Sequence, residues 1–242
     1  MRLLVVNPNT TPSMTRTIGA AARAVAAPGT EIVAVEPSMG PASIEGVYDG
    51  ALAVPGLLQT IAAQPADGIV IACFDDTGLD AARSAAAVPV VGIGEAAYHV
   101  ASLVSDRFTV ITTLSRSVPV IERNLAVTGL RSRCARVRAS DIPVLALEEP
   151  GSDARRRISD MVARALQEDG ADGIVLGCAG MADFAAELSR AHGVPVIDGV
   201  AAAVKLIESL LALGLSTSKA GIWARPLAKP YQGSLAAFSP RS

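Results

Sequence analysis

The octapeptides ADGIVIAC at residues 66–73 and ADGIVLGC at residues 171–178 are nearly identical and lie 105 positions apart. Each is a short, β-branched apolar run that ends in a cysteine, as a buried strand does where it gives way to a loop. Two more apolar runs recur in the same order: RLLVVN at 2–7 with RFTVIT at 107–112, and VPV at 88–90 with VPV at 194–196. The ordered matches indicate an internal duplication that keeps one thiol in each copy.

Composition narrows the class of protein. The chain has 242 residues, enough for one domain or two small ones. Its net charge of −2 gives no electrostatic footprint for nucleic acid. No apolar run approaches the roughly 20 residues of a membrane span, and the apolar start is too short for a signal peptide. We therefore expect a cytoplasmic protein that binds neither nucleic acid nor membrane.

The cysteines and histidines are few. There are three cysteines, none in a CxxC pair, and two histidines. This pattern predicts reduced thiols and no zinc site, because a disulfide framework uses paired cysteines and structural zinc needs about four ligands.

Short β-branched runs alternate with Ala- and Leu-rich stretches, which is typical of a parallel sheet covered by helices. We expect strands near 2–7, 30–36, 67–73, 89–93, 107–113, 132–138, 172–178 and 194–197. We expect helices near 12–27, 47–64, 79–87, 95–105, 117–128, 153–169, 182–192 and 200–213. Eight such units suit two open, mostly parallel α/β sheets related by a pseudo-two-fold axis, or a single closed βα barrel. In both, functional side chains gather at the carboxyl ends of the strands.

Four polar side chains fall at those predicted strand ends: Asn7, Cys73, Thr112 and Cys178. Both thiols precede a predicted helix start, where free N–H groups and the helix dipole favour an anion. Free cysteine also packs as a small hydrophobe, which is our interpretation of Cys134 within a predicted strand. Two repeat-related thiols facing one cleft would instead suit a reaction on opposite faces of a planar carbon.

Six sequence words together resemble the hydantoin and allantoin racemase family, within the wider aspartate/glutamate racemase superfamily. They are NPNTT at 7–11, SIEG at 43–46, ACF at 72–74, PVVGIGEAA at 89–97, LGCAGM at 176–181 and PVIDGV at 195–200. The resemblance implies two similar α/β halves around a central cleft, a reaction that needs no cofactor, and one catalytic cysteine from each half. It also implies a small-molecule substrate and a homo-oligomer.

By position, the resemblance implies that Cys73 and Cys178 are the paired acid and base. From the strand ends and loops around these thiols, we expect a substrate-binding set of Asn7, Ile44, Phe74, Asp75, Thr112, Thr113, Gly177, Ala179 and Gly180, with Asp76, Glu95 and Asp198 in support. We expect a first half at 1–105, completed by 207–242, and a second half at 106–206. The active site would lie between them, with residues 38–48 forming a loop over it.

One departure from the family pattern concerns the first thiol. After the first Cys-Phe the family usually has a small residue and then Asp-Pro-Gly, whereas here residues 75–78 read DDTG. If Asp75 points into the cleft, its charge would raise the pKa of Cys73 and disfavour anionic substrates. We therefore expect Cys178 to be the readier thiolate.

The favoured hypothesis is racemisation of a 5-substituted hydantoin or of allantoin, by two-base proton transfer at C5. Two alternatives share the fold: an aspartate/glutamate-type racemase and a maleate cis-trans isomerase. Arylmalonate decarboxylases of this group are known with a single active-site cysteine, so the second thiol argues against that activity. A ligand-binding module without catalysis is the alternative from another class.

Overall fold

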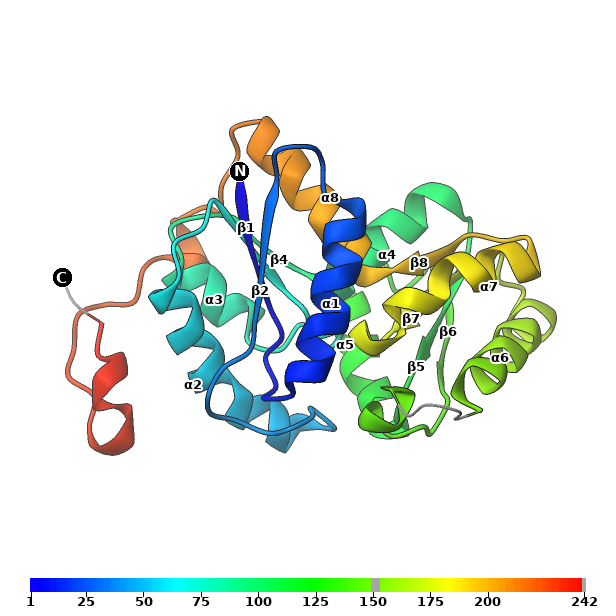
Figure 1. Ribbon diagram of the computed structural model, residues 1–242, viewed down its shortest axis with the longest axis horizontal. Coiled ribbons are helices and arrows are strands. Elements are labelled where there is room, and N and C mark those ends of the chain that lie inside the picture. Colours follow the sequence, from blue (N-terminus) through cyan, green and yellow to red (C-terminus); the bar gives the residue numbers. More distant parts are fainter. Residues whose placement is uncertain (149–152, 241–242) are drawn as a thin grey trace.

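Two four-stranded parallel sheets form the framework of the computed structural model, which describes residues 1–148 and 153–240 (Figure 1). The first contains β1 (Arg2–Val6), β2 (Glu31–Val35), β3 (Gly68–Ile71) and β4 (Val90–Gly92), in the order β2-β1-β3-β4. The second contains β5 (Phe108–Thr112), β6 (Cys134–Ala139), β7 (Gly173–Gly177) and β8 (Val196–Asp198), in the equivalent order β6-β5-β7-β8. The predicted two-sheet α/β fold is confirmed, and the closed barrel does not form.

The repeated Ala-Asp-Gly words begin the two central strands, and each residue type has a structural reason. Asp67 accepts a hydrogen bond of 2.7 Å from the backbone N–H of Arg2, and Asp172 accepts one of 2.8 Å from that of Arg107. Each carboxylate thereby ties the start of β3 or β7 to the start of the neighbouring strand. The glycine that follows leaves room for a neighbour: a Cβ at Gly68 would lie 2.8 Å from Ile207.

Eight α-helices cover the sheets. They are α1 (Pro12–Val25), α2 (Val47–Ala63), α3 (Leu79–Ala85), α4 (Ile93–Val104), α5 (Val118–Val127), α6 (Ala154–Glu168), α7 (Ala185–His192) and α8 (Gly199–Ala212), in residues 1–148 and 153–240. Short 3₁₀ helices add η1 (Ser115–Ser117), η2 (Val144–Glu148), η3 (Ala179–Phe184), η4 (Gly221–Trp223) and η5 (Gly233–Phe238). The helix predicted at 182–192 therefore becomes α-helical only at Ala185, because the chain leaves the strand end in the tighter η3 turn.

The halves exchange helices where they meet. Helix α4 follows the first sheet but packs on β7 and β8 of the second, and α8 follows the second sheet but packs on β3 and β4 of the first. Their amino ends touch, since a Cβ at Gly199 would lie 2.6 Å from the carbonyl oxygen of Ile93. Helix α8 begins at Gly199 and contacts strands of both sheets. The division at 105 and 206, with completion of the first half by 207–242, stays a prediction.

The segment after α8 runs back along α3 before leaving the body of the molecule (Figure 1). The indole N–H of Trp223 donates to Asp80 at 2.9 Å, and the Arg83 guanidinium lies 4.8 Å from the centre of the indole ring. These contacts hold part of the C-terminal segment against α3 of the first half. Within residues 1–148 and 153–240, no helix has both the length and the apolarity to cross a bilayer.

The two repeat glycines give a test of the packing. A Cβ at Gly173 would lie 2.7 Å from the Cβ of Ser105, which is fixed to the backbone, whereas the nearest neighbour at Gly68 is the rotatable end of Ile207. We expect Gly173→Ala to lower the free energy of unfolding by roughly 1–3 kcal/mol and Gly68→Ala by less. Urea unfolding of both variants measures this, and equal losses would contradict the role given to Ser105.

Candidate active site

Both repeat-related cysteines line one small cavity between the halves, at the carboxyl ends of the strands. Its volume is about 40 Å³, a few times the space that one water needs. Ten predicted site residues line it: Asn7, Ile44, Cys73, Phe74, Asp75, Thr112, Thr113, Gly177, Cys178 and Ala179. Gly180 does not line it but adjoins Cys178, since a Cβ there would lie 3.7 Å from the sulfur.

Cys73 follows β3 and opens a wide loop. Its sulfur lies 3.4 Å from the Thr77 hydroxyl, and the Asp76 N–H closes the turn on the Cys73 carbonyl at 3.0 Å. Part of its surface is open to the cavity, yet the dense surroundings raise the pKa of the thiol to about 12. Burial contributes most and the negative charge of Asp75 comes second, while Thr77 and the Asp75 N–H act in the opposite direction.

The expectation that a helix start lowers the pKa of this thiol is wrong for Cys73. Helix α3 begins only at Leu79, so the loop separates the sulfur from the first-turn N–H groups. Cys178, by contrast, is itself the N-cap residue of η3, and the Met181 N–H donates to its carbonyl at 3.0 Å. The equivalent thiols therefore enter two different loops.

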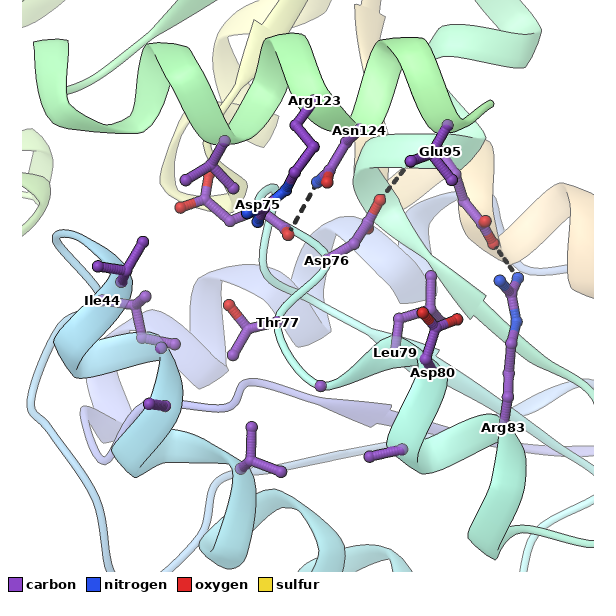
Figure 2. Close-up of a pocket in the computed structure, with 18 of the residues that line it drawn as sticks. Ile44, Asp75, Asp76, Thr77, Leu79, Asp80, Arg83, Glu95, Arg123 and Asn124 are labelled. Atoms are coloured by element: carbon purple, nitrogen blue, oxygen red, sulfur yellow. Dashed lines mark hydrogen bonds and ion pairs between the residues drawn. The ribbon is translucent and has the colours of Figure 1, made fainter. Parts of the chain in front are cut away.

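Asp75 is held in the wall of the cavity by the second half. The Ser117 hydroxyl donates to its carboxylate at 3.4 Å, and the Asn124 amide donates to its carbonyl at 3.0 Å. Figure 2 shows Arg123 reaching from α5 toward the same carboxylate. Burial raises the pKa of Asp75 to about 6, against the lowering effects of Ser117 and then Arg123. Asp75 thus lies in the cleft and disfavours the Cys73 thiolate, as the sequence indicated.

The three supporting carboxylates serve helix starts. Asp76 accepts from the backbone N–H groups of Gly94 at 2.9 Å and Glu95 at 2.8 Å, and so fastens the Cys73 loop to α4. Burial, followed by the charge of Glu95, raises its pKa. Glu95 accepts from the Gly92 N–H at 3.2 Å and pairs with Arg83 (Figure 2). Asp198 accepts two 2.9 Å bonds from the N–H groups of residues 200 and 201.

Asn7 and Thr112, which we expected to donate hydrogen bonds to a ligand, donate to other groups of the protein instead. The Asn7 amide donates to Asn9 at 2.8 Å and Thr15 at 3.1 Å, and the Thr112 hydroxyl donates to the Gly177 carbonyl at 3.0 Å. Thr113 also lines the cavity, and its hydroxyl has no hydrogen-bond partner among the described residues. Thr113 is therefore the side-chain donor that is available to a ligand.

Six lining residues were not predicted: Pro8, Asn9, Met14, Ala72, Ser117 and Val144. Pro8, Asn9 and Ala72 belong to sequence words that carry the family resemblance, and Met14 lies three residues after the first of these words, so a wider choice around them would have found all four. Ser117 and Val144 come from η1 and the start of η2, where no repeated word marks them.

A loop of residues 36–46, here called the strap, brings Ile44 over the cavity. The Glu45 carbonyl accepts from Arg116 at 3.2 Å, and its carboxylate accepts from the Val144 N–H at 3.3 Å. The strap thus reaches from the first half to the second, as expected of residues 38–48, although α2 already begins at Val47. Within residues 1–148 and 153–240, no group of three His, Cys, Asp or Glu is arranged to hold a metal ion.

Comparisons with known proteins agree with this arrangement. A family model described as Asp/Glu/Hydantoin racemase matches residues 3–207. The chain belongs to this family. A hydantoin racemase of Rhizobium meliloti is 50% identical over 96% of this chain and 98% of its own length. A hydantoin racemase of Pseudomonas sp. (strain NS671) is 43% identical over 98% of this chain and 97% of its own.

A solved structure extends the similarity to the whole fold. Allantoin racemase from Klebsiella pneumoniae matches with a TM-score of 0.97 and 51% identity, and the match covers 100% of both chains. The family resemblance predicted from the sequence is confirmed. As a member of the Asp/Glu/hydantoin racemase family, the chain is an isomerase of the racemase type.

The charge of Asp75 gives a pH-dependent prediction. Removing it should stabilise the Cys73 thiolate, so Asp75→Asn should lower the pKa of Cys73, while burial keeps it above the usual value. The rate of iodoacetamide alkylation against pH measures this in a Cys134→Ala, Cys178→Ser background that leaves one thiol. Asp106→Asn, at an exposed position outside the cavity, is the control. An unchanged titration of Cys73 in Asp75→Asn would contradict the coupling.

Proposed function

We propose that the protein racemises 5-substituted hydantoins or allantoin by two-base proton transfer between Cys73 and Cys178. The observation that carries this proposal is that the two repeat-related thiols, one from each half, line the same cavity. The similarity to hydantoin and allantoin racemases supports the substrate class.

Both proton transfers take place at C5 of the ring. A thiolate on one face takes the C5 proton, and the electrons of the C–H bond move into the adjacent carbonyl as an enolate. The opposing thiol delivers its proton to the other face, the carbonyl reforms, and that sulfur is left as the thiolate. The substrate carbonyl is the electron sink, so we propose a reaction without a cofactor.

Such a pair works when one member is a thiol and the other a thiolate. The raised pKa of Cys73 keeps it protonated at neutral pH, with Asp75 reinforcing the effect of burial. We therefore assign Cys73 as the resting acid and Cys178 as the resting base. The Thr113 hydroxyl and the backbone N–H groups at the η3 turn are the proposed donors to the enolate oxygen.

The lining of the cavity disfavours the alternative substrates. Amino acids and maleate carry carboxylates, which usually require a fixed cation or a strong anion site. None of the described residues that line the cavity is Lys or Arg, and Asp75 adds a negative charge. A neutral cyclic ureide needs no cation in the cavity and is not repelled by the charge of Asp75. Homo-oligomeric assembly and a cytoplasmic location stay predictions.

Replacing each thiol separately tests the mechanism. We expect Cys73→Ser and Cys178→Ser each to slow racemisation of an L-5-alkylhydantoin by about 10²–10⁴-fold, because each removes one of the two proton-transfer groups. Optical rotation follows the reaction. Cys134→Ala is the control, since Cys134 is buried in β6 away from the cavity. Full activity in either serine variant would exclude a two-thiol mechanism.

Isotope exchange distinguishes the classes of function. In deuterated water the wild-type protein should label C5 of either hydantoin enantiomer, because both faces meet a thiol that exchanges with solvent. A ligand-binding module would label nothing. NMR of a panel containing hydantoins, allantoin and acidic amino acids measures the labelling, and preferential labelling of an acidic amino acid would favour the amino-acid racemase alternative.

A further inference from the structure

A second, larger hollow adjoins the two-thiol cavity. It has a volume of about 610 Å³ and lies between α2 and α5, with the loop that follows Cys73 as its floor (Figure 2). Ile44 and Asp75 line both spaces, so the two meet at these side chains. We call this larger hollow the α2/α5 groove.

Both helical walls of the groove carry aliphatic side chains among their polar ones. Helix α2 contributes Val47, Ala51 and Val54, and α5 contributes Val120 and Val127. Val47 is 72% exposed and Val127 is 82% exposed, although neither is a residue type that gains from contact with water. The groove therefore offers apolar surface that a ligand would cover.

The charged groups around the groove already have partners. Arg83 pairs with Glu95, the Asp80 carboxylate accepts from Trp223 at 2.9 Å, and Arg123 acts on the carboxylate of Asp75. Four acidic lining residues, Asp75, Asp76, Asp80 and Glu95, outnumber the two arginines. These acidic residues would repel an anionic group, whereas the exposed aliphatic side chains would make favourable contacts with a neutral apolar group.

We propose that the α2/α5 groove binds the C5 substituent of the substrate and selects neutral alkyl and arylalkyl groups. This inference rests on the proposed racemase function. The cavity of about 40 Å³ leaves no room for a large substituent beside the ring, so the substituent must leave it past Ile44 and Asp75. In the planar enolate the substituent lies in the plane of the ring, away from both thiols, so one groove serves both enantiomers.

Filling the groove from one wall is the first test. Ala51 occupies an exposed helical position that faces the groove, where a larger side chain can be added without disturbing the core. We expect Ala51→Phe to lower the ratio of kcat/KM for 5-benzylhydantoin to that for 5-methylhydantoin by roughly 10–100-fold. Leu52→Phe is the matched control, because Leu52 is the next residue, is 51% exposed and does not line the groove.

The opposite wall provides an independent pair of variants. Val127→Phe should lower the same ratio, and Ala126→Phe, outside the groove on the same helix, should leave it unchanged. In the wild type, 5-(2-carboxyethyl)hydantoin should react more slowly than 5-benzylhydantoin. Unchanged ratios in both groove variants, or equal rates for the acidic and benzyl substrates, would overturn the inference.

The outcomes separate this inference from the proposed function. If the wild-type protein labels C5 of neither hydantoin in deuterated water, the proposed function fails. If it labels both and the groove variants keep the wild-type ratio, the function stands and the groove assignment fails.

Discussion

The hydrogen bonds that Asp67 and Asp172 accept from the starts of β1 and β5 fix the geometry on which the site depends. They lock each central strand against its neighbour in the same register, with Leu3 opposite Gly68 and Phe108 opposite Gly173. Because a parallel ladder carries register along its whole length, both strands end at equivalent levels. Each thiol therefore follows its central strand at an equivalent level, and the packing of α4 and α8 between the halves brings both to one cavity.

The framework is symmetric, but the loops that leave it are not. The loop after Cys73 is anchored to α4 through Asp76 and to α5 through Asn124, so the first thiol is enclosed and close to Asp75. Cys178 instead caps a short 3₁₀ turn. In the proposed reaction, the duplicated scaffold would supply the two faces of attack. Asp75, which disfavours the Cys73 thiolate, would keep Cys73 as the proton donor.

The sequence predicted those parts of the structure that depend on residues close together in the chain. The repeated words predicted the strands and the thiols at their ends, and the departure at Asp75 predicted the direction of the Cys73 pKa. Periodicity does not encode which sheet a helix covers, so the packing of α4 on the second sheet was not predicted. Nor does a residue type reveal whether its donors are already used: Thr112 looked available to a ligand, but its hydroxyl bonds Gly177. Ser117 and Val144 were missed because only the docking of the two halves brings them to the cavity.

The strap crosses from the first half to the second at the edge of the cavity, which Ile44 lines. Its cross-links to the second half include two hydrogen bonds of Glu45, with Arg116 at 3.2 Å and with the Val144 N–H at 3.3 Å. Each bond of this kind contributes only about 1 kcal/mol net, because water replaces the lost partner. Releasing them is therefore cheap compared with separating the packed interface of α4 and α8. In the proposed reaction, release of the strap would widen the cavity at Ile44 for the ring, and it would also open the α2/α5 groove, which Ile44 and Gly46 line.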